Sequence, residues 1–260
     1  EQMIKLIISD LDGTLADNKG QIPEEAFTVI EDLEKKNIHF AVATGRQCAT
    51  VENDFKSVLD KIYVIADNGA LIKHKGKCVG VTYLEQEKAR EVIEEVKRLE
   101  NIDMIISCED TAYKITKDKA FHEEVSKYYY SLSYVQDQSL IEASIIKLAL
   151  YNKDGITKEF ETWLREKWGE DFSITVSGRN WVDIGSLYTS KGMAVKMLKE
   201  QLIIEKENCM AFGDYFNDVS MLAEVEESYV MEHAPEEMKA YGKYSLDEGS
   251  VLKVIKERCL

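Results

Sequence analysis

Cysteine and proline are both scarce in this chain, and neither forms a recognisable pattern. The 260 residues include five cysteines and two prolines. An odd number of cysteines with no Cys-x-x-Cys pair argues against a disulfide framework or a structural zinc site and favours reduced thiols. No apolar run approaches the roughly 20 residues that a membrane-spanning helix requires, and Lys5 and Ser9 interrupt the first apolar segment. We therefore expect a cytoplasmic protein without a membrane span or signal peptide.

Positive charge is also in short supply. The chain has 33 Lys and Arg against 48 Asp and Glu, which gives a net charge of -15 and a pI near 4.8. This balance argues against nucleic acid or an anionic membrane as a partner, because both require basic surfaces. An anionic substrate would need cations supplied locally by its own site. With 45% hydrophobic and 31% charged residues, the composition is that of a folded globular protein.

Two aspartates follow the first apolar run of the chain. Ile4 to Ile8 is expected to form a buried strand of a parallel sheet, and Asp10 and Asp12 come directly after it, followed by Gly13. In an extended backbone, residues two apart point to the same side, so the two carboxylates would repel unless a cation or a shared proton intervenes. An ordinary strand end with an Asp-Gly turn is one interpretation. A metal-assisted carboxylate nucleophile with an acid/base partner is the other.

Three later segments place further polar residues where such a site needs them. The apolar run 38–43 ends at Thr44-Gly45-Arg46, and the run 209–212 leads to Asp214, Asn217 and Asp218. Lys191 opens a segment with apolar residues at helical spacing. In an open α/β sheet, ligands bind at the carboxyl ends of the strands. The sequence therefore predicts that these residues meet at one edge of a sheet.

The order of apolar patterns predicts two domains. Alternating strand and helix patterns in residues 1–82 and 184–260 indicate an α/β fold with a doubly wound, mostly parallel sheet. Residues 83–183 have a different texture, in which amphipathic helices and short strands predict an inserted α+β domain. The insert falls between the Thr44 and Lys191 segments.

The order of these motifs, beginning with Asp10-Leu11-Asp12-Gly13-Thr14, resembles the haloacid dehalogenase (HAD) superfamily of phosphoryl-transfer enzymes. The position of the insert resembles the Cof-like branch, whose caps belong to subclass IIB. The resemblance implies a Rossmann-like core with a cap domain, and an Mg²⁺-dependent phosphatase acting on small phosphorylated metabolites, often sugar phosphates. One departure stands out. Relatives tend to have a Gly-Asn pair before Ala-Pro, whereas this chain has Glu232-His233. His233 itself is expected to be solvated.

The resemblance also implies a role for each motif residue. Asp10 would attack phosphorus to form an aspartyl-phosphate, Asp12 would act as general acid and base, and Lys191 would draw charge from the phosphoryl group. Mg²⁺ would be bound by Asp10, the Asp12 main-chain carbonyl and Asp214. Asp218 would hold Lys191 or a metal-bound water from behind these groups. The remaining contacts to phosphate or substrate would come from Leu11, Thr44, Gly45, Arg46, Lys191 and Asn217.

Other interpretations stay open at this point. A phosphomutase of the phosphomannomutase type would use the same residues, and a receiver-like phosphoacceptor or a non-catalytic sugar-phosphate-binding module would be a different class of protein. Taken singly, Lys191 could be a solvated first-turn lysine, Asp218 a helix-start residue and Arg46 a surface residue. The sequence names neither the physiological substrate nor the oligomeric state, for which a homodimer is one option.

Overall fold

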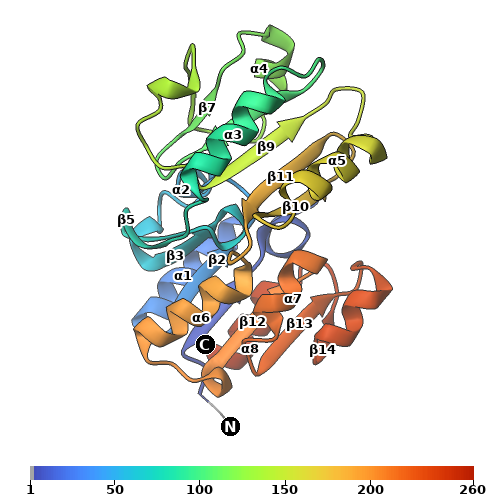
Figure 1. Cartoon of the computed structure of the whole chain (residues 1–260). Helices are drawn as coiled ribbons and strands as arrows, with labels where there is room; N and C mark the ends of the chain where they lie inside the picture. Colours follow the sequence, from blue (N-terminus) through green and yellow to red (C-terminus); the bar gives the residue numbers. More distant parts are fainter. Residues whose placement is uncertain (1–2) are drawn as a thin grey trace. The chain divides into compact units, whose positions relative to one another are not determined.

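A computed structural model describes residues 3–260, shown in Figure 1. The chain divides into two compact units. The first comprises Glu1–Gly80 and Ser190–Leu260, and the second comprises Val81–Thr189. Within residues 3–260, no helix combines the length and the apolar character that crossing a membrane requires.

The first unit is built on an eight-stranded sheet with the order β14-β13-β12-β1-β2-β3-β4-β5. All neighbours from β14 to β3 pair in parallel, and β4 runs antiparallel to β3. The strands are β1 (Leu6–Ser9), β2 (His39–Ala43), β3 (Ile62–Ala66), β4 (Leu71–His74), β5 (Lys77–Val81), β12 (Cys209–Gly213), β13 (Glu227–Met231) and β14 (Tyr244–Leu246).

Helices cover this sheet, which explains why its central strands are apolar without alternation. Leu6, Ile7 and Ile8 are all fully buried, although neighbouring residues of a strand point to opposite faces. One face packs against apolar residues of α6 and α7, and α1 and α8 contact each other. The helices of this unit are α1 (Glu24–Lys35), α2 (Cys48–Asp54), α6 (Lys191–Leu202), α7 (Val219–Leu222) and α8 (Val251–Cys259). This confirms the predicted α/β fold with a mostly parallel core.

The second unit has a six-stranded sheet with the order β10-β11-β9-β6-β7-β8. Its pairs are antiparallel except that between β7 and β8. Its elements are α3 (Gln86–Val96), β6 (Asp103–Ser107), β7 (Ala112–Lys114), α4 (Lys119–Val125), β8 (Leu132–Tyr134), β9 (Lys147–Tyr151), α5 (Lys158–Trp168), β10 (Phe172–Ser177) and β11 (Trp181–Ser186). Apolar residues of α3 and α5 form one core cluster with the sheet, and Phe121 and Val125 of α4 belong to another.

Some element ends differ from the sequence pattern. The pattern predicts a helix over 86–100, but α3 ends at Val96. Leu99, the last apolar residue of the pattern, is 37% exposed and adds little burial there. The Lys- and Tyr-rich stretch after residue 116 supplies only the short α4, which ends where the Ser126 hydroxyl donates to the His122 carbonyl. Side-chain bonds of this kind compete with continued helix.

Candidate active site

The site begins at the carboxyl end of β1. The Asp10 amide donates to the Phe212 carbonyl at 3.0 Å and so extends the pairing of β1 with β12 by one residue. A tight turn over Leu11–Leu15 follows, with Gly13 at a φ of 78°. The Thr14 hydroxyl donates to Asp10 Oδ2 at 3.3 Å. Asp10, only 6% exposed, is thereby fixed at the edge of the sheet.

Lys191 lies between two carboxylates. Its Nζ is 2.6 Å from Asp10 Oδ1 and 2.6 Å from Asp218 Oδ1, and its side chain is fully buried. The lysine occupies the first position of α6, where the Ser190 hydroxyl caps the helix by accepting from the Met193 amide. A solvated first-turn lysine is thus inconsistent with the structure. Lys191 instead links β1 to the segment that follows β12.

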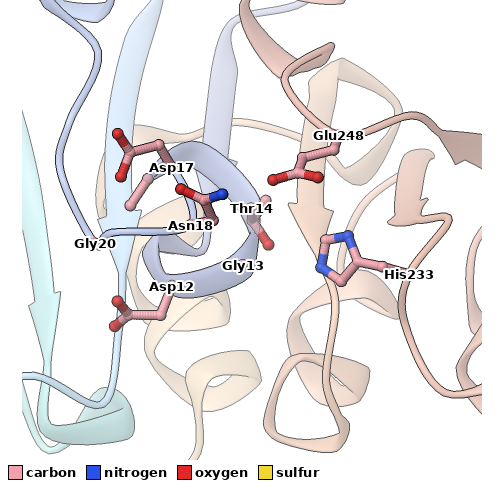
Figure 2. Close-up of a pocket in the computed structure, with 9 residues that line it drawn as sticks. Asp12, Gly13, Thr14, Asp17, Asn18, Gly20, His233 and Glu248 are labelled. Atoms are coloured by element: carbon pink, nitrogen blue, oxygen red, sulfur yellow. The ribbon is translucent and has the colours of Figure 1, made fainter.

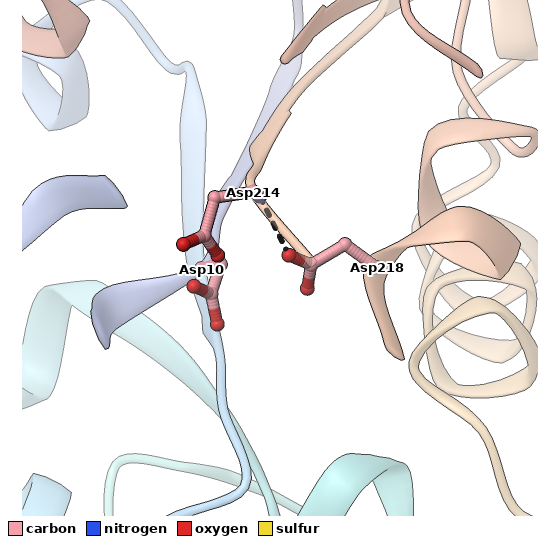
Figure 3. A group of neighbouring side chains, drawn as sticks. All are labelled: Asp10, Asp214 and Asp218. Carbon is pink, nitrogen blue, oxygen red and sulfur yellow. Dashed lines mark hydrogen bonds between the residues drawn. The ribbon is translucent and has the colours of Figure 1, made fainter. Parts of the chain in front are cut away.

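Asp214 and Asp218 complete an acidic cluster with Asp10. Asp218 Oδ2 accepts from the amides of Asp214 and Tyr215 at 2.9 and 3.1 Å, which holds the loop after β12 in place. One ligand atom from each of the three aspartates lies within 4.8 Å of the other two. Figure 3 shows the carboxylates of Asp10 and Asp214 next to each other, with Asp218 bonded to the main chain at Asp214.

The cluster is short of positive charge. Burial raises the pKa of Asp10 to about 8, with the charges of Asp218 and Asp214 acting in the same direction and Lys191 opposing them. Burial, followed by Asp218, also raises the pKa of Asp214. Burial alone would lower the pKa of Lys191, but Asp10 and Asp218 outweigh it, so this pKa rises and the lysine stays charged. Three carboxylates face one ammonium group, so the cluster carries excess negative charge that a bound cation would offset.

A divalent cation fits this set of residues. The raised pKa values of Asp10 and Asp214 show that the protein alone does not offset their charge. Carboxylate, carbonyl and water oxygens are the ligands preferred by hard cations. The cluster that the structure brings together is Asp10, Asp214 and Asp218. The predicted metal ligands were Asp10, Asp214 and the main-chain carbonyl of Asp12. Asp218 was predicted to hold Lys191 or a metal-bound water instead of binding the metal.

The carboxylate of Asp12 points away from this cluster and pairs with Arg46. Arg46 Nε and Nη2 donate to the two Asp12 oxygens at 2.9 and 2.5 Å. Nη1 donates to Asp54 at 3.0 Å and Nη2 also reaches the Gly20 carbonyl at 3.2 Å. Arg46 was predicted to contact phosphate or substrate. In the structure its guanidinium is committed to protein groups, and the side chain of Asp12 is 60% exposed.

Thr44, Gly45 and Asn217 lie on the same edge of the sheet. Thr44 is buried, and its hydroxyl accepts from the Arg46 amide at 3.1 Å. Asn217 Nδ2 donates to Asn68 Oδ1 at 3.0 Å. A Cβ on Gly45 would lie 3.3 Å from the Asn68 amide, so Asn68 lies directly against this glycine. Asn68 was not among the predicted site residues. Its place after the third strand, at the ligand-binding edge, was the available signal.

Comparison with known proteins identifies the family of the chain. Residues 7–255 match the family model of the haloacid dehalogenase-like hydrolases. The chain belongs to this family. It is thus an enzyme, a HAD-type phosphatase in class, as the resemblance predicted.

Individual relatives span almost the whole hydrolase. It is 28% identical over 257 residues to the 5-amino-6-(5-phospho-D-ribitylamino)uracil phosphatase YbjI of Escherichia coli, covering 97% of this chain and 95% of that protein. A solved structure from Eubacterium rectale is 26% identical and has a TM-score of 0.90. The match covers 98% of this chain and 99% of that one. The subclass IIB sugar phosphatase BT4131 shares the fold at 20% identity, with a TM-score of 0.78 over 97% of this chain and 98% of that one.

A histidine of the hydrolase that was expected to be solvated lies beside the acidic cluster. His233 Nε2 is 3.4 Å from Asp214 Oδ2, although 43% of the histidine side chain remains exposed. His233 also lines a pocket of 360 Å³ together with Asp12, Gly13, Thr14, Ala16, Asp17, Asn18, Gly20 and Glu248. In Figure 2, His233 and the side chain of Asp12 lie on opposite sides of the turn after β1, which supplies Asp12, Gly13 and Thr14 to the pocket lining.

Gly69 allows the close approach on which the position of Lys191 depends. It has a φ of 101°, and a Cβ there would lie 2.1 Å from the Ser190 carbonyl oxygen. Because Ser190 caps the helix that Lys191 opens, we expect Gly69→Ala to destabilise the hydrolase by more than about 1 kcal/mol and to lower its activity. Chemical denaturation and a phosphatase assay would measure both effects.

Gly76→Ala is the matched control for Gly69→Ala. Gly76 also has a positive φ, 70°, but nothing lies within 4 Å of its added Cβ. It should therefore show the backbone strain without the steric clash. Equal losses in the two variants would contradict the idea that the contact with Ser190 matters.

Proposed function

We propose that this hydrolase is an Mg²⁺-dependent phosphatase that cleaves small phosphorylated metabolites, sugar phosphates among them, through an aspartyl-phosphate intermediate. The observation that carries the proposal is the buried Asp10 carboxylate. It lies at the end of the central strand β1, paired with Lys191 at 2.6 Å and within 4.8 Å of two further aspartates. A carboxylate kept this close to other anions is suited to a charged, metal-assisted reaction.

The reaction would run in two displacements. An Asp10 oxygen would attack phosphorus in line with the ester oxygen, so that the Asp10–phosphorus bond forms as the ester bond breaks. Asp12 would give a proton to the leaving alkoxide. Water would then attack the phosphorus while Asp12 takes a proton from it, releasing inorganic phosphate and restoring the Asp10 carboxylate. Acid/base help of this kind is typically worth about 10²–10⁴-fold.

The residues around Asp10 would bind and orient the phosphoryl group. The Lys191 ammonium is aimed at Asp10 from α6 and would lie beside the phosphoryl oxygens as well. Thr44, Asn217 and the main chain at Leu11 and Gly45 would supply uncharged donors. We assign Arg46 to holding Asp12, because its guanidinium grips both oxygens of that carboxylate. Asp12 would have to leave this pair to reach the ester oxygen.

Mg²⁺ would be held by Asp10, Asp214 and the main-chain carbonyl of Asp12, with Asp218 behind them. When bound, the ion would withdraw charge from the phosphoryl oxygens and offset repulsion between the attacking carboxylate and the phosphate. The support is the cluster of Asp10, Asp214 and Asp218, whose carboxylates carry an excess of negative charge. The Asp12 carbonyl is assigned from the family resemblance.

We propose that the insert, predicted as residues 83–183, is the substrate-selecting cap. In its support, the compact unit Val81–Thr189 has its own sheet and its own core clusters. A cap that excludes water and contacts the leaving group would separate selection from the chemistry at Asp10. The name of the E. coli relative, which specifies a phosphorylated ribitylamino-uracil, agrees with a small phosphorylated metabolite as substrate.

The test is phosphate release from a panel of phosphorylated metabolites. We expect phosphate release in the presence of Mg²⁺, no phosphate release after EDTA is added, and renewed phosphate release when Mg²⁺ is supplied in excess of EDTA. Activity that survives chelation would contradict the metal assignment. A hexose 1,6-bisphosphate belongs in the panel as a control, since a mutase would need it as an activator and would release little inorganic phosphate.

A further inference from the structure

His233 stands on a short connection whose backbone is well anchored. The Glu232 amide donates to the Leu246 carbonyl of β14 at 2.7 Å, and the Ala234 amide donates to the Met231 carbonyl at the end of β13 at 3.0 Å. Ala234 is itself buried. The imidazole therefore projects from a fixed backbone rather than from a free loop.

The imidazole and Gly13 confine one oxygen of Asp214 from two directions. Asp214 Oδ2 is 3.4 Å from His233 Nε2. A Cβ placed on Gly13 would lie 2.1 Å from the same oxygen and 3.4 Å from Nε2. Since an ionised carboxylate can only accept hydrogen bonds, Nε2 is the donor of this pair. The contact thus limits how the Asp214 carboxylate can turn, while Asp218 holds only the Asp214 main chain.

We propose that His233 is a positioning residue that orients the Asp214 carboxylate toward a divalent cation. The inference rests on the proposed function, because it assumes that Asp214 binds the metal. His233 is not placed as a ligand: among residues 3–260, the cluster of mutually close ligand atoms is Asp10, Asp214 and Asp218. Hydrogen-bond partners of metal ligands fix ligand orientation, and losing one typically costs about 10–100-fold in metal affinity.

The experiment is a titration of the 260-residue protein with Mn²⁺, followed by isothermal titration calorimetry and by the Mn²⁺ electron paramagnetic resonance spectrum. We expect His233→Ala to weaken Mn²⁺ binding by about 10–100-fold. His233→Gln should restore most of the affinity, because the glutamine amide nitrogen can stand where Nε2 stood. His122→Ala is the matched control. His122 is on α4, where its ring lies 3.5 Å from the Ser126 hydroxyl, so its removal should leave binding unchanged.

Further variants separate failure of this inference from failure of the proposed function. Asp214→Asn should lose Mn²⁺ binding altogether. If wild-type protein bound no Mn²⁺, the metal-dependent function would fail. If Asp214→Asn lost binding and His233→Ala did not, only the role of His233 would be overturned. Loss of Co²⁺ and Zn²⁺ binding with Mg²⁺ binding intact would also overturn it, since that pattern indicates an imidazole ligand rather than a positioning donor.

Discussion

Asp10→Asn should reduce phosphate release to background, a loss on the order of 10⁴-fold or more in kcat. The amide cannot form the acyl phosphate because its nitrogen lone pair is delocalised and its oxygen carries no charge. The fold should survive the change. The asparagine oxygen can still accept from Lys191, which sits 2.6 Å from Asp10 Oδ1, and Lys191 keeps its pair with Asp218.

The stability of the Asp10→Asn variant gives a second, independent readout. Burial, with repulsion from Asp218 and Asp214, raises the pKa of Asp10 from 3.8 to about 8. A folded-state pKa above the unfolded value means that ionising Asp10 lowers stability progressively as pH rises between those two values. A neutral asparagine escapes that loss, so the melting temperature near pH 8 should be equal to wild type or higher.

Asp32→Asn is the matched control for this change. Asp32 is a partly exposed residue of α1 that pairs with Lys35, and its replacement should alter neither turnover nor melting temperature. Turnover of Asp10→Asn within tenfold of the control would remove Asp10 from the role of nucleophile.

Much of the site could be predicted because it depends on strand ends. The parallel core follows from apolar runs such as 4–8 and 38–43, and the polar residue after each run is brought to one edge by the topology alone. That logic placed Asp10, Thr44 and Asp214 near one another without any knowledge of side-chain conformation. Lys191 could be added to this group because the start of a helix can also be predicted from a sequence.

The remaining features depend on side-chain directions that no pattern encodes. The Asp12 carboxylate pairs with Arg46 outside the cluster, because β1 ends at Ser9 and the turn over Leu11–Leu15 begins between the two aspartates. Residues two apart then no longer share one side, as the strand-based argument assumed. His233 approaches Asp214 from the connection that follows β13, a strand that the sequence pattern did not predict. Asn68 reaches Asn217 across 149 residues of chain, and such long-range pairs are settled only by the folded structure.

Lys191→Met should be the most destabilising of the proposed substitutions. Its Nζ is the only cation at hydrogen-bond distance from both Asp10 and Asp218 within residues 3–260. Removing one partner of a buried ion pair leaves an uncompensated charge, which costs about 3–5 kcal/mol. Activity should fall on the order of 10²–10³-fold as well, since a preorganised donor to the phosphoryl group is lost. Urea denaturation and phosphate release would measure the two effects.

The double variant Lys191→Met/Asp218→Asn separates the structural role of Lys191 from its chemical role. Asp218 is fully buried, so neutralising it should restore part of the stability lost in the single variant while leaving activity low. Lys35→Met, which removes an exposed lysine from a surface pair, should leave the urea midpoint unchanged. If Lys191→Met unfolded at the same urea concentration as Lys35→Met, the buried carboxylates would have to be compensated by some other group. The claim that this lysine offsets the charge of the cluster would then be wrong.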